Sequence, residues 1–193
     1  WADGKEITLE NINLEAANLI EANLSHANLL GANLQEANLT NANLVRANLC
    51  KANLYEANLY RIDLSGASLQ EADLRWANLF ETSLIEANLR GADLSYTSLN
   101  NVYLDSTKLD GAKVMDNYTV KGDYGYITIG PLGRSNNYTL FFNCNEGIYV
   151  KCGCVTGPID LFQKEVKDTH GNNNHASDYF DAIKYVKSIF KRR

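Results

Sequence analysis

Residues 17–59 read ANLIEANLSHANLLGANLQEANLTNANLVRANLCKANLYEANL, and the triplet Ala-Asn-Leu returns in them every five residues. Leucine occupies every fifth position from Leu9 to Leu109, 21 times without a gap, and Val114 extends the series to 22 units. Two positions before this central residue stands Ala in 15 units and a β-branched residue in the other seven. Asn directly precedes the central residue in 12 units. A repeat this regular is the first evidence to use in predicting the fold.

A period of five fits neither a helix nor a flat strand. On an α-helix each Leu would lie about 140° around the axis from the last, so no apolar stripe would form. On a flat strand an odd period sends alternate Leu side chains to opposite faces. Within a unit, however, Ala and Leu are two residues apart and share one face, and the polar residues between units are suited to turns. The pattern therefore predicts a coil with Ala and Leu inside, stabilised by stacking of successive coils.

The A-N-L-x-x run resembles the pentapeptide-repeat family over about residues 7–115. The resemblance implies a right-handed, four-sided β-helix with 20 residues per coil, or about 5.5 coils in this chain. We therefore expect a mainly β protein, with a β-helical rod over residues 1–115 and a small α+β domain over residues 116–193. Residues 20 apart stack on one side of such a rod. The inward column that we expect to form the structural core contains Leu19, Leu39, Leu59, Leu79 and Leu99.

Outward positions of the coil carry aromatic residues with charged residues around them, a combination typical of binding patches. Stacked aromatic residues also stabilise neighbouring coils, which is the purely structural interpretation of the same pattern. The candidate interaction surface consists of Tyr55, Tyr60, Trp76, Phe80, Tyr96, Glu36, Glu56 and Glu81.

Charge divides the chain into the same two parts. The net charge of the whole chain is −5, and residues 1–112 contribute −8 while residues 113–193 contribute +3. This acidic balance argues against direct binding of nucleic acid, because neutralising phosphates requires a surplus of Lys and Arg. No run approaches the roughly 18 apolar residues of a membrane span, so we expect no membrane partner. An acidic rod can also imitate duplex DNA, as the quinolone-resistance members of the family do towards gyrase.

Residues after Val114 follow a different pattern. Alternation predicts strands over 124–129, 138–144 and 148–152, with Asn145-Glu146-Gly147 as a three-residue hairpin loop. Pro158 is typical of a first helical turn, and Gly171 ends that helix. A second helix is predicted from near Ser177, which completes a β-β-β-α-α domain that caps the rod or forms a homodimer. The apolar faces of the two helices are Ile159, Phe162 and Val166, and Tyr179, Ile183, Val186 and Phe190.

Cysteines and histidines of this region are candidate zinc ligands. A hairpin that pairs Cys144 with Ile148 places Cys144 and Cys152 about 13 Å apart, beyond the reach of a shared metal or a disulfide. The spacing Cys152-Gly-Cys154 is also not that of a zinc knuckle. We therefore predict reduced thiols, no metal and no cofactor, although His170 and His175 lie nearby.

No nucleophile, phosphate-binding or metalloprotease motif occurs in the sequence, and a convex rod lacks the concave pocket that catalysis needs. We predict a non-enzymatic scaffold that binds an unidentified protein partner. The alternatives are a DNA-mimicking modulator of a type II topoisomerase, and a C-terminal domain with its own ligand or enzymatic activity. The unpaired cysteines predict a cytoplasmic location.

Overall fold

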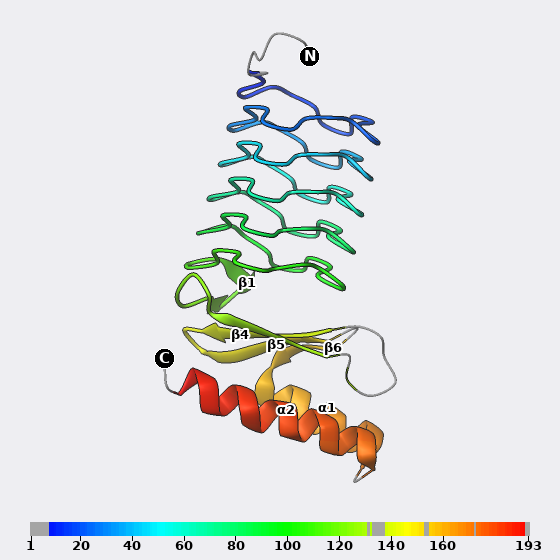
Figure 1. Cartoon of the computed structure of the whole chain (residues 1–193), viewed down its shortest axis with the longest axis vertical. Coiled ribbons are helices and arrows are strands. Elements are labelled where there is room, and N and C mark those ends of the chain that lie inside the picture. The colour runs from blue at the N-terminus through cyan, green and yellow to red at the C-terminus, as the bar shows by residue number, and fades with distance from the viewer. Residues whose placement is uncertain (1–7, 131, 133–137, 153–154, 172, 192–193) are drawn as a thin grey trace. The chain divides into compact units, whose positions relative to one another are not determined.

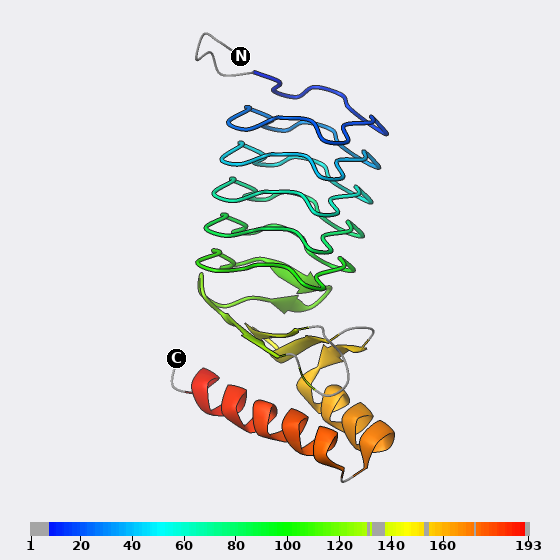
Figure 2. The same cartoon turned by 45° about the vertical axis from the view of Figure 1, so that its right-hand side comes forward.

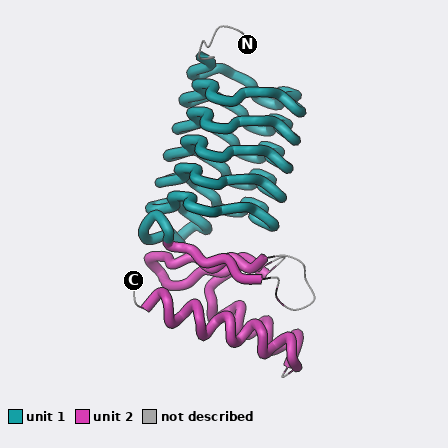
Figure 3. The backbone as a smooth tube through the Cα atoms, in the orientation of Figure 1, with its two compact units in different colours: residues 1–124 teal, residues 125–193 magenta. Residues whose placement is uncertain are grey.

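The computed structural model describes residues 8–130, 132, 138–152, 155–171 and 173–191. The chain divides into two compact units, residues 1–124 and residues 125–193, which Figure 3 colours separately. The division therefore falls between Tyr124 and Gly125, whereas the sequence pattern placed it between residues 115 and 116.

The first unit is a stack of similar coils (Figures 1 and 2). Parallel bridges join residues 20 apart, from Thr8 with Asn28 to Asp93 with Lys113. From Leu9 to Leu94, the backbone N–H of each central Leu donates to the residue 19 positions later, as Leu34 does to the carbonyl of Asn53 at 2.7 Å. Four five-residue units therefore complete one coil, and we call this β-helix the rod.

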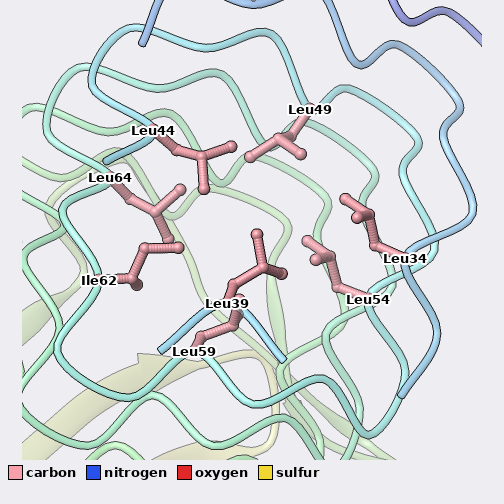
Figure 4. A pocket seen from close by; sticks show the side chains of 8 residues that line it. All are labelled: Leu34, Leu39, Leu44, Leu49, Leu54, Leu59, Ile62 and Leu64. Carbon is pink, nitrogen blue, oxygen red and sulfur yellow. The ribbon is translucent and has the colours of Figure 1, made fainter. Parts of the chain in front are cut away.

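The interior of the rod is filled by the predicted Leu and Ala columns. Leu39, Leu59 and Leu79 are at most 1% exposed, and Leu99 is 6% exposed. Leu19 is only partly buried, because it lies in the first coil and stacks on Leu39 alone. Figure 4 shows how the Leu side chains from successive coils converge, and the space between them is too small for a water molecule. The interior between these Leu side chains is therefore dry and offers no room for a ligand.

The turn of each unit is made by the two residues after the central Leu. The second of them has a left-handed backbone, with φ near 60°, whether it is a Gly such as Gly31 or a large residue such as Trp76. The Asn before the Leu stabilises this turn, as in Asn53, whose Oδ1 accepts a hydrogen bond from the N–H of Tyr55 at 3.1 Å. Asn side chains also bond from coil to coil, with Nδ2 of Asn53 donating to Oδ1 of Asn33 at 3.1 Å. The Asn column is therefore a hydrogen-bonded ladder.

The last coil of the rod is closed by the chain that follows it. Strand β1 (Lys113–Met115) and strand β2 (Tyr118–Thr119) form an antiparallel pair. Beyond β2, the carbonyls of Val120 and Asp123 accept from the N–H groups of Gly111 and Leu109, both at 2.9 Å. These residues, which the sequence pattern assigned to the C-terminal domain, pair with the backbone at that end of the rod.

The second unit is an antiparallel sheet with two helices on one face. The helices α1 (Ile159–His170) and α2 (Asn174–Phe190) bury the two apolar faces that the sequence predicted, together with Phe141 and Val150 of the sheet. Gly171 follows α1 as its C-cap, also as predicted. The strand order is β3 (Tyr126–Ile129), β4 (Thr139–Cys144), β5 (Gly147–Cys152), β6 (Val155–Pro158).

Two details of the predicted β-β-β-α-α domain are wrong. The sheet has a fourth strand, β6, at an edge, where Pro158 is tolerated because its missing N–H is not needed for pairing on the outer side. The hairpin between β4 and β5 pairs Cys144 with Gly147, not with Ile148. A slip of one residue changes the face of every side chain on β5 relative to β4. Cys152 consequently packs with the helix-side core, whereas Cys144 points to the opposite face of the sheet.

Candidate interaction surface

The predicted surface residues lie at turn positions on two consecutive sides of the rod. One side consists of the units centred on Leu34, Leu54, Leu74 and Leu94, and it carries Glu36, Tyr55, Glu56, Trp76 and Tyr96; we call it the tryptophan side. The next side consists of the units centred on Leu39, Leu59 and Leu79, and it carries Tyr60, Phe80 and Glu81; we call it the phenylalanine side.

The most exposed aromatic pair of the rod is on the tryptophan side. The rings of Trp76 and Tyr96 stack with centroids 4.5 Å apart and an interplanar angle of 7°. This spacing is close to the separation of neighbouring strands, about 4.8 Å, so the rings lie in step with the coils. Trp76 is 55% exposed and Tyr96 is 40% exposed. Tyr96 is also fixed at its outer end, because its hydroxyl donates to Oδ2 of Asp116 at 3.0 Å, and this carboxylate raises the pKa of Tyr96.

An arginine is bound beside this stack by the rod itself. The guanidinium of Arg75 forms two hydrogen bonds to Asp73, from Nε to Oδ1 at 2.8 Å and from Nη2 to Oδ2 at 2.6 Å. Its Cζ atom lies 5.4 Å from the ring centroid of Tyr55, one coil earlier, which is a cation–π distance. The hydrogen bonds from Arg75 lower the pKa of Asp73, and a hydrogen bond to Glu56 raises the pKa of Tyr55.

The phenylalanine side has a more closed arrangement. The rings of Tyr60 and Phe80 are 5.9 Å apart with an interplanar angle of 24°, and both residues are only partly exposed. Arg61 places its Cζ atom 4.9 Å from the centroid of Tyr60 and donates from Nε to Oε2 of Glu81 at 2.5 Å. Glu81 therefore already has a cationic partner. The eight residues of the predicted interaction surface thus separate into two groups. The group around Trp76 is exposed, and in the group around Tyr60 the carboxylate of Glu81 is paired with Arg61.

Charge is also distributed unequally around the rod. The tryptophan side extends to residue 116 and carries five carboxylates but only two cations, Arg75 and Lys113. Both cations are paired, with Asp73 and with Asp93. Three further rod cations form ion pairs on other sides, namely Lys51–Glu71, Arg61–Glu81 and Arg90–Asp123. No salt bridge to Glu36 or Glu56 occurs in the described part of the chain.

Asp116 is a site residue that sequence reasoning missed. It is the last residue of the unit centred on Val114, one residue beyond the rod boundary predicted at residue 115. The 20-residue register would have found it, since Asp116 is 20 positions after Tyr96.

The second unit shows a different cluster at the end of its helices. The ring of His170 lies 5.8 Å from that of Tyr179 with an interplanar angle of 18°, and 6.2 Å from that of His175. Cys152 is close to the same helix and accepts from Oγ1 of Thr139 at 3.0 Å. Among the described residues, no three His, Cys, Asp or Glu side chains form a group able to hold a metal ion. Cys154 lies outside the described residues.

The described helices include none that is long and apolar enough to cross a membrane.

Comparison with known proteins relates the rod to one family. The family described as "Pentapeptide repeats" matches in overlapping copies over residues 6–34, 32–70, 42–79, 57–95 and 82–115. No curated protein matches the chain. No family is assigned to the C-terminal domain.

Solved structures of pentapeptide-repeat proteins are similar to the rod. HetL from Nostoc sp. strain PCC 7120, a pentapeptide-repeat protein involved in heterocyst differentiation regulation, is 36% identical over 56% of this chain, with a TM-score of 0.31. Rfr23 from Cyanothece 51142 is 32% identical over 57% of this chain and 88% of its own, with a TM-score of 0.35. QnrB1, a plasmid-mediated fluoroquinolone resistance protein, is 17% identical over 55% of this chain and 71% of its own, with a TM-score of 0.31. The match spans 59% of the length of HetL.

Proposed function

Because the chain belongs to the pentapeptide-repeat family, whose fold is a right-handed β-helix, we propose that it is a non-enzymatic scaffold whose tryptophan side binds a protein partner. The observation that supports this proposal is the exposed stack of Trp76 on Tyr96, on the same side of the rod as the carboxylates of Glu36 and Glu56. Aromatic residues that are rigidly held and partly exposed are the residue type most enriched at the energetic centres of protein interfaces.

The backbone supplies a second argument for binding. Trp76 and Tyr96 have φ angles of 62° and 63°, in the left-handed region. This conformation costs a residue with a side chain about 1–2 kcal/mol relative to the right-handed one, and Gly avoids that cost. Gly fills the same turn position at Gly31, Gly66 and Gly91. The rod therefore does not require a large aromatic residue at this position, and a binding role explains why two stand there in register.

Capture of a partner from an extract of the native cell tests the proposal. The bait is the full chain, compared with the Trp76→Gly/Tyr96→Gly double variant and with an Ile85→Ala control. Ile85 is an exposed apolar residue on the side of the rod opposite the tryptophan side. We expect a specific protein that the wild type and the Ile85 variant retain and the double variant loses. Equal retention by all three baits would contradict the assignment of the surface.

DNA mimicry towards a type II topoisomerase is the second candidate, and the net charge of −8 over residues 1–112 favours it. The ion pairs on the other sides of the rod weigh against it, because a mimic of duplex DNA needs an extended negative surface. A gyrase supercoiling assay separates the two candidates. Inhibition at micromolar protein would support mimicry, and no inhibition would remove it.

The capping and dimerisation roles proposed for the C-terminal domain can be tested by truncation. Capping by the C-terminal domain is tested by deleting residues 125–193, since a rod that stays folded, soluble and monomeric would argue against it. Homodimerisation through that domain instead predicts a dimeric full chain and a monomeric fragment. A ligand-binding or enzymatic activity of that domain, the absence of a cofactor and the cytoplasmic location stay predictions.

A further inference from the structure

We propose that the partner segment recognised by the tryptophan side is basic and bears arginine, with one guanidinium stacked on the free face of Trp76 and paired with Glu56. The inference rests on the proposed function, and it adds the chemistry of the partner.

The free face of Trp76 follows from the geometry of the stack. Tyr96 lies 20 residues after Trp76 and covers one face of its indole, since the rings are nearly parallel at 4.5 Å. The other face points towards the preceding coil, where Glu56 occupies the equivalent turn position and is exposed. Trp76 remains 55% exposed with Tyr96 in place. A flat cation can therefore extend the stack by one layer, between the indole and a carboxylate.

The rod contains an internal example of this recognition. Arg75 lies between a carboxylate, Asp73, and an aromatic ring, Tyr55, with two hydrogen bonds to the first and a Cζ-to-centroid distance of 5.4 Å to the second. Arg61 repeats it with Glu81 and Tyr60 on the next side. Both sites combine a ring of one coil with a carboxylate at close range. Trp76 and Glu56 offer the same two partners, but no cation of the described chain occupies them.

The negative charge of the tryptophan side favours a positively charged partner. Glu36 and Glu56 are exposed and lack salt bridges in the described residues, and Glu56 is held in place by its hydrogen bond with Tyr55. An acidic face repels the phosphates of nucleic acids, so the stack is not a platform for bases. A lysine ammonium satisfies the charge but cannot stack as a plane or form two parallel hydrogen bonds to one carboxylate. Arginine is therefore favoured over lysine.

Fluorescence anisotropy of labelled hexa-arginine tests the inference, with labelled hexa-lysine as the matched probe, at about 50 mM salt to limit screening. The full chain should bind hexa-arginine about two- to fivefold more tightly than hexa-lysine, the range expected for one exposed cation–π contact. Trp76→Gly should remove this preference, and Trp76→Phe should retain part of it. Circular dichroism of each variant establishes that the rod is folded.

A charge-matched control separates specific pairing from general attraction. Glu86 has the same turn position and a φ of 58°, but it lies on the opposite side of the rod from Glu56, whose φ is 55°. Glu56→Gln should weaken hexa-arginine binding about threefold, the size expected for one exposed ion pair, and Glu86→Gln should leave it nearly unchanged. Equal effects of the two substitutions, or equal affinity for the two peptides, would overturn the inference. If the captured partner is still lost on removing Trp76 and Tyr96 while the peptides bind equally, the proposed function stands and the arginine chemistry fails.

Discussion

Alanine substitution in the Asn ladder should have very different effects at two positions that look alike in the sequence, Asn58 and Asn43. Oδ1 of Asn58 accepts from the N–H of Tyr60 at 3.3 Å and from Nδ2 of Asn78 at 3.2 Å. Its Nδ2 donates to Oγ1 of Thr40 at 3.0 Å and to Oδ1 of Asn38 at 3.4 Å. The side chain of Asn58 thus connects three successive coils.

Asn43 has the same place in its unit but fewer partners. Its Oδ1 accepts from the N–H of Val45 at 3.0 Å, which is the one hydrogen bond of this side chain to the described residues. Asn43 is also exposed, so water can replace the lost partner after substitution.

The expected magnitudes follow from the bonds lost. One hydrogen bond contributes about 0.5–1.5 kcal/mol to stability, and long bonds fall at the lower end. Asn58→Ala loses four bonds, three of them at 3.2 Å or more, so the free energy of unfolding should fall by about 2–3 kcal/mol. Asn43→Ala should lower it by about 1 kcal/mol. Any change in strand propensity is common to both variants and cancels in their comparison.

Urea unfolding followed by far-ultraviolet circular dichroism measures both variants against the wild type. The fluorescence of Trp76, which belongs to the same rod, gives a second probe of the unfolding transition. Equal loss of stability in the two variants would refute the reasoning, because it would mean that the inter-coil bonds of the ladder contribute nothing.

Three further predictions test the core, the charges and the second unit. Leu59→Ala should lower the free energy of unfolding by about 3–5 kcal/mol and Leu19→Ala by clearly less, since Leu19 is only partly buried; similar urea midpoints would contradict this. Arg75 holds the pKa of Asp73 below its ordinary value, so this stabilisation is complete above about pH 4 and is lost as the pH falls through the lowered pKa. When the free energy of unfolding is measured against pH, Asp73→Asn should reduce its fall at low pH. An unchanged fall would argue against the Arg75–Asp73 ion pair. Asn173→Ala removes the cap bond to the N–H of Ala176 at 3.0 Å and should cost the second unit about 1 kcal/mol in thermal unfolding.

The sequence predicted the second unit less completely than the rod. The apolar faces of its helices were found because Phe162 and Val166, or Ile183 and Phe190, recur at helical spacing. Strand β6 was missed because Gly157 and Pro158 oppose strand formation locally, and only pairing with β5 stabilises it.

The register of the β4–β5 hairpin could also not be predicted from the sequence. Asn145-Glu146-Gly147 suits a three-residue loop, but the chain pairs Gly147 directly with Cys144 and keeps a φ of 115° there. Loops of two and three residues differ little in local preference, so the packing of Phe141 and Val150 against the helices decides between them.

The sequence by itself determined the coiled fold and the residues of its interior. Only a chain that turns in every unit can direct 22 central residues, spaced five apart, to the inside. It also placed aromatic and acidic residues on the outside. Which of them form a surface was decided by the tertiary structure. The contacts are made between residues 20 apart, and they depend on how the side chains of those residues are oriented. Tyr60 and Phe80 are enclosed by the ion pair of Arg61 with Glu81, whereas the stack of Trp76 on Tyr96 stays open. That difference depends on where two long side chains find their partners, and a five-residue pattern carries no information about it.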